Sequence, residues 1–170
     1  SSMFGLFKGR KQKDREFMEG LMRAAAEGDN RAKINRALGS EGIQLAPEED
    51  NAQYCVHASA AIVRLIAKKA GIPIAETNDE DDKFVAGIFA FVVSNYISYI
   101  VGAPFEIVSS IVVIDLFGAE YATEVDSLAD SYKSMSQEGR VIEAIGRNTQ
   151  KWISAPTNEQ LVKLVALYEL

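Results

Sequence analysis

Apolar residues recur at helical spacing along almost the whole chain, whereas the alternating pattern typical of a strand is nearly absent. In the stretch DREFMEGLMRAAAEG, for example, Phe17, Leu21 and Ala24 fall on one side of a helix. The pattern therefore predicts an all-α fold: a single-domain helical bundle of seven or eight helices.

Glycine, proline and capping residues divide this pattern into separate helices. Gly28 and the DN that follows it end a first helix and cap a short second one. Pro47 suits the first turn of a third helix, which stops at Gly71. The T-x-x-E pattern at Thr77 predicts a capping box that starts the fourth helix, and Thr157 is expected to cap the last one.

The most apolar part of the chain runs from Phe84 to Gly118 and contains no basic residue. Its first 22 residues, up to Phe105, carry no charge, so they could span a bilayer or form a core helix. Polar side chains in the middle of the segment and an acidic leading flank favour the core helix. Because Pro104 breaks the run, we predict a central hydrophobic helical hairpin over residues 84–118.

Two features of this hairpin bear on packing and binding. Small residues at every fourth position would let another helix approach closely. They are Ala86, Ala90, Ser94, Ser98 and Gly102. The polar residues Asn95, Tyr96 and Tyr99 form a candidate pocket for a small apolar ligand.

An acidic amphipathic helix is predicted after the hairpin. Its apolar stripe advances in steps of four and three residues: Tyr121, Val125, Leu128, Tyr132 and Met135. Four acids flank this stripe: Glu120, Glu124, Asp126 and Asp130. Like charges four residues apart repel each other, and no cation lies nearby in the sequence. The ordinary interpretation is a solvated acidic surface, and the same acids are the candidate contact with a basic protein partner.

The final helix, in NEQLVKLVALYEL, is apolar over more of its circumference than one core-facing stripe requires. Leu167 and Leu170 are therefore candidate partner-binding residues, most simply in a homodimer. The alternative is that neighbouring helices bury this helix on all sides.

Net charge differs between the two ends of the chain. Residues 1–36 carry nine Lys or Arg and five Asp or Glu, whereas the remaining residues carry nine and nineteen. Nucleic-acid binding is not expected, because the acidic body would repel phosphates. Ser1 and Ser2 resemble an expression scar, and the rest of residues 1–15 is predicted to be a flexible basic arm before the domain at 16–170. This arm could contact anionic lipid through Phe4, Leu6, Phe7, Lys8, Arg10, Lys11 and Lys13.

Candidate catalytic side chains are few. Cys55 and His57 are the single cysteine and histidine, and two residues along a helix are about 200° apart, so they should point to opposite faces. Cys55 falls on the apolar side and His57 on the polar side. Asp115 lies near the end of a predicted helix, where a negative charge interacts unfavourably with the helix dipole, and we expect it to be exposed. No phosphate-binding, dinucleotide-binding or nucleophile-elbow motif occurs, so we predict no cofactor, metal site or catalytic residue.

These observations favour a non-enzymatic cytoplasmic protein-interaction module, such as an adaptor, regulator or immunity-type inhibitor, that uses an acidic helical surface. Two alternatives stay open. One is a peripheral membrane protein that acts through its N-terminal arm or the hairpin, and the other is a bundle that binds a small apolar ligand.

Overall fold

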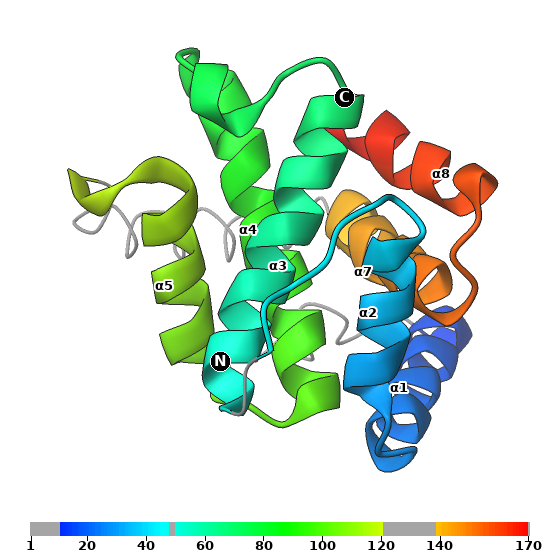
Figure 1. Ribbon diagram of the computed structural model, residues 1–170. Coiled ribbons are helices and arrows are strands. Elements are labelled where there is room, and N and C mark those ends of the chain that lie inside the picture. Colours follow the sequence, from blue (N-terminus) through cyan, green and yellow to red (C-terminus); the bar gives the residue numbers. More distant parts are fainter. Residues whose placement is uncertain (1–10, 48–49, 121–138, 170) are drawn as a thin grey trace.

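The computed structural model describes residues 11–47, 50–120 and 139–169, and these residues form a bundle of α-helices without a strand (Figure 1). Seven α-helices and one short 3-10 helix follow one another in this part of the chain. They are α1 (Lys11–Ala26), α2 (Asn30–Gly39), α3 (Asn51–Lys69), η2 (Ile74–Glu76), α4 (Glu80–Val101), α5 (Phe105–Phe117), α7 (Gly139–Ser154) and α8 (Asn158–Tyr168). The predicted all-α fold is confirmed.

Helix α4 is the centre of the bundle. It packs against α1, α3, α5 and α7, with α5 on one side of the α3–α4 pair and α1, α2, α7 and α8 on the other (Figure 1). By length and composition, α4 is the one helix of the described residues that could cross a membrane. However, 78% of its apolar window is buried inside the fold. Its apolar surface is thus already used in packing against other helices.

The predicted ridge of small residues lies within this packed region. Ala86, Ala90, Ser94 and Ser98 are all buried, as expected for a close helix crossing. Gly102 has a different role. It adopts a left-handed conformation, with φ of 93°, and ends the helix by donating its N–H to the Ser98 carbonyl.

The two helices of the predicted hairpin are both present, but they differ in burial. Helix α4 is covered on nearly all sides, whereas α5 contributes one face to the core, through Val108, Val112 and Leu116. The helix that pairs with α4 through the middle of the bundle is α3 (Figure 1). Helix α5 therefore lies at the edge, because no described element covers its outer side.

Several predicted helix starts differ from the observed ones. Pro47 precedes α3, whose cap is Asp50, and Thr77 precedes α4, whose cap is Asp79. The Asp79 carboxylate accepts from the N–H groups of the first turn, while the Thr77 hydroxyl donates to the Pro73 carbonyl instead. An aspartate immediately before the helix satisfies the first N–H groups of the turn directly. The predicted Thr157 cap of α8 is confirmed by its bond to the Gln160 N–H.

Two further predictions concern the start of the chain and the acidic helix. Helix α1 begins at Lys11, inside the segment 1–15 that we predicted to be a flexible arm. The predicted helix with the stripe from Tyr121 to Met135 lies outside the described residues.

Candidate functional site

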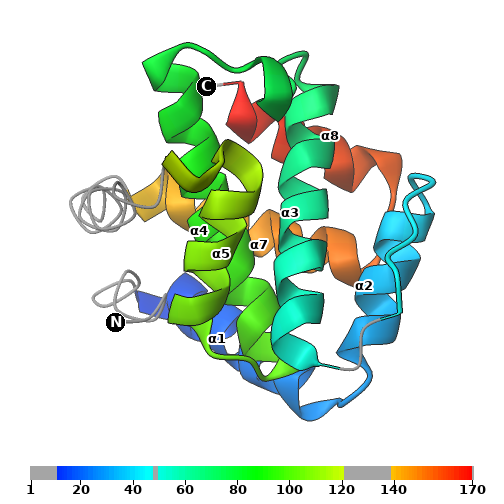
Figure 2. The same ribbon diagram turned by 60° about the vertical axis from the view of Figure 1, so that its left-hand side comes forward.

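The outer face of α5 carries a stripe of exposed isoleucines. Ile107, Ile111 and Ile114 are 55%, 44% and 36% exposed, and their spacing of four and three residues places them on one side of the helix. Figure 2 turns this edge of the bundle toward the viewer. The other large exposed apolar side chains of the described residues, Met22 and Val162, lie singly on α1 and α8. The isoleucine face is thus the main apolar cluster on the described surface.

Acidic side chains border the isoleucine face at both ends. Glu106 lies in the first turn of α5, Asp115 in its last turn, and Glu120 follows the helix; all three are exposed. Arg64 of α3 pairs with Asp115, with 3.2 Å between Nη1 and Oδ2, and its Nη2 donates to the Asp115 carbonyl at 2.9 Å. Asp115 is exposed, as we predicted, and this cation, 51 positions away in the sequence, offsets its unfavourable place at the helix end.

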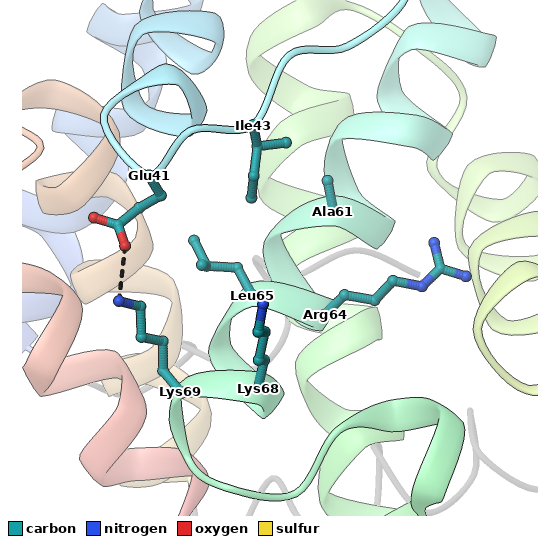
Figure 3. Close-up of a pocket in the computed structure, with 7 residues that line it drawn as sticks. All are labelled: Glu41, Ile43, Ala61, Arg64, Leu65, Lys68 and Lys69. Carbon is teal, nitrogen blue, oxygen red and sulfur yellow. Dashed lines mark ion pairs between the residues drawn. The ribbon is translucent and has the colours of Figure 1, made fainter.

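A second feature is a cavity of about 680 Å³ between α3 and the connector that follows α2 (Figure 3). Its lining consists of Glu41, Ile43, Ala61, Arg64, Leu65, Lys68 and Lys69. Glu41 and Ile43 come from the connector, and the other five come from successive turns of α3. A smaller hollow of about 210 Å³ between α3 and α8 shares Lys69 with it.

The cations of the larger cavity differ in their partners. Lys69 pairs with Glu41, with 3.1 Å between Nζ and Oε1, and Arg64 pairs with Asp115. Lys68 is exposed and makes no ion pair with any described residue. Since the cavity carries three cations and one acid, it is positive although the chain as a whole has a net charge of −6.

The residues of the predicted ligand pocket lie elsewhere, inside the packed part of α4. Asn95 and Tyr96 are buried and Tyr99 is half-buried, and none of the three lines either cavity described above. The Asn95 side-chain N–H₂ group has no hydrogen-bond partner among the described residues, and burial raises the pKa of Tyr96. Sequence reasoning missed the larger cavity because one wall is a connector and the other is a helix, and no sequence motif links the two segments.

The predicted partner-binding residues are only partly described. Glu120 is exposed and directly follows the isoleucine face, whereas Glu124, Asp126, Asp130 and Leu170 lie outside the described residues. Leu167 is half-buried and packs against the core, so it offers less apolar surface than we predicted. In the predicted N-terminal membrane contact, residues 4–10 are outside the description, and Lys11 and Lys13 belong to α1.

Cys55 and His57 point to different surroundings, as we predicted. Cys55 is fully buried, and its Sγ lies 3.9 Å from the Ile97 carbonyl oxygen. Burial raises the pKa of the Cys55 thiol to about 12, so the reactive thiolate is scarce at neutral pH. His57 is exposed. The two side chains therefore do not form a catalytic pair.

Among the described residues, no three His, Cys, Asp or Glu side chains come together in a way that could hold a metal ion. Comparisons of the chain with protein-family models, curated proteins and solved structures found no match, so its function has to be inferred from its own geometry.

Proposed function

We propose that the protein is a non-enzymatic interaction module that binds a partner helix along the isoleucine face of α5. The observation that carries this proposal is the alignment of three exposed isoleucines on one side of a single helix. Complete burial of an exposed isoleucine is worth about 1.5–3 kcal/mol, and these three side chains are already about half-buried, so covering the row would gain roughly half of that for each. Clustered apolar surface of this kind commonly marks a binding interface.

The charges around this face indicate the chemistry of the partner. Glu106, Asp115 and Glu120 border the isoleucines, and Arg64 pairs with Asp115. A helix with an aliphatic stripe and basic flanks would complement this surface. A second copy of the chain would instead place acids against acids, which costs free energy. We therefore favour a basic protein partner over the homodimer that the final helix suggested.

The test uses a synthetic amphipathic helical peptide with a leucine stripe flanked by lysines. Titration calorimetry should show binding that weakens as salt is raised, because the flanking charges are screened. Ile111→Glu should weaken binding about tenfold or more, since it removes apolar contact and buries a charge. Met22→Glu is the matched control. The exposed fraction of Met22, 57%, is similar to that of Ile107, 55%, but Met22 lies on α1 and not on the isoleucine face.

The competing interpretations predict different results. If Ile111→Glu and Met22→Glu weaken peptide binding equally, or neither does, the α5 interface is wrong. A homodimer would appear as twice the monomer mass in light scattering, with that mass reduced by Ile111→Glu. A membrane role would appear as co-sedimentation of the protein with anionic vesicles in the absence of any peptide.

A further inference from the structure

We propose that the cavity beside the end of α3 binds an aliphatic carboxylate, with its carboxylate at Lys68 and its chain against Ile43 and Leu65 (Figure 3). This site is separate from the isoleucine face and does not depend on the proposed partner. A volume of about 680 Å³ lies within the range of small-molecule sites.

The charge balance of the lining favours a ligand with one negative charge. Arg64 and Lys69 are each paired with a carboxylate of the protein, Asp115 and Glu41 respectively. Lys68 is the cation of the lining that makes no such pair with a described residue. A ligand carboxylate would supply the missing partner, and a charge-assisted hydrogen bond to an ammonium is stronger than one between neutral groups.

The apolar part of the lining favours an aliphatic chain. Ile43, Ala61 and Leu65 are the uncharged residues of the larger cavity, and no aromatic side chain lines it. The smaller hollow beyond Lys69 adds four aliphatic side chains, Leu161, Val162, Val165 and Ala166, beside the polar Asn158 and Glu169. A flexible hydrocarbon chain can follow such surfaces, whereas an aromatic ring would find no ring to stack against.

The same lining disfavours a peptide as the occupant. A bound peptide brings backbone N–H and C=O groups that need hydrogen-bond partners once they are removed from water. The larger cavity has no amide or hydroxyl side chain among its lining residues, and its polar side chains are three cations and Glu41. A carboxylate attached to a hydrocarbon chain leaves no such group unsatisfied.

The experiment is titration calorimetry of the full chain with decanoate, acetate, decanol and decylammonium, each below its solubility limit. Decanoate should bind, decanol should bind about tenfold more weakly because it lacks the charge, and decylammonium should not bind. Equal affinity for decanoate and decanol would overturn the role of Lys68. Equal affinity for decanoate and acetate would overturn the role of the aliphatic wall.

Variants locate the site. Lys68→Gln should weaken decanoate binding about tenfold, and Ile43→Ser should weaken it through the loss of apolar contact. Lys151→Gln is the matched control, because Lys151 is also an exposed lysine in the last turn of a helix, α7, but does not line the cavity. If Lys68→Gln and Lys151→Gln behave alike, the proposed site is wrong. Ile111→Glu should leave decanoate binding unchanged, so the two proposals can fail separately.

Discussion

Asn30 joins the ends of two helices, and its replacement should destabilise the whole bundle. Its side chain is 4% exposed, and Nδ2 donates to the carbonyl oxygens of Ala24 and Ile100, each at 2.8 Å. Ala24 lies in the last turn of α1 and Ile100 in the last turn of α4. Carbonyls at these positions lack partners within their own helix, so a single amide completes two helix ends at once.

The size of the effect follows from these two bonds. The Ala24 oxygen also accepts from the Glu27 N–H at 3.2 Å, so it keeps one partner in Asn30→Ala. The Ile100 bond is buried, and its loss leaves a carbonyl without a partner, which costs about 1–3 kcal/mol. Together with about 1 kcal/mol for the other bond, we expect Asn30→Ala to lower the free energy of unfolding by about 2–4 kcal/mol.

Urea denaturation followed by circular dichroism measures this loss. The midpoint should fall while the dependence of the unfolding free energy on urea stays unchanged. Asn148→Ala is the matched control: its Nδ2 also donates to a carbonyl at 2.8 Å, that of Ala144, but within its own helix. We expect this control to cost about 1 kcal/mol or less. If Asn30→Ala costs no more than Asn148→Ala, the bridge between α1 and α4 does not contribute as argued.

Three further predictions concern the core. Ser94→Leu should lower the free energy of unfolding by about 1–3 kcal/mol through overpacking. Ser94→Ala should be nearly neutral because the hydroxyl has no hydrogen-bond partner among the described residues; equal stability of the two variants would place the ridge outside the core. Iodoacetamide at pH 8 should modify Cys55 in urea but not in the native protein, as mass spectrometry would show. Because burial raises the pKa values of Cys55 and Tyr168 from 9.0 and 10.0 to about 12 each, their contribution to stability is fully present below about pH 9 and is lost as pH rises toward 12. Urea midpoints that stay constant from pH 8 to about pH 12 would contradict this.

Much of the fold could be predicted from local patterns. A helix places residues three and four positions apart on one side, so the spacing of apolar residues predicts where helices form. The same geometry separates Cys55 from His57, and it holds whatever the rest of the chain does. Thr157 was correctly identified as a cap because its hydroxyl acts on an N–H three residues away. Capping by Thr77 was wrong because α4 begins at Glu80, so that Asp79 is the residue directly before the helix and accepts from the N–H groups of Asp81 and Asp82.

The candidate sites, in contrast, depend on segments that lie far apart in the sequence. Asn30 and Ile100 are 70 positions apart, and Arg64 and Asp115 are 51 apart, so no local pattern predicts either contact. The larger cavity likewise requires the connector at Glu41 to lie beside the last turns of α3.

Helix α5 shows most clearly what the sequence determines and what only the tertiary structure decides. Its buried residues, such as Val112, and its exposed ones, such as Ile111, are equally apolar, so the sequence determined that α5 is a hydrophobic helix but not which side faces the core. The packing of α3 and α4 against one side buries Val112 and, among the described helices, leaves the isoleucine face exposed. The physical reason is that the hydrophobic effect is non-directional, so burial of either apolar face of α5 would be favourable. The face that is buried is the one against which neighbouring helices pack.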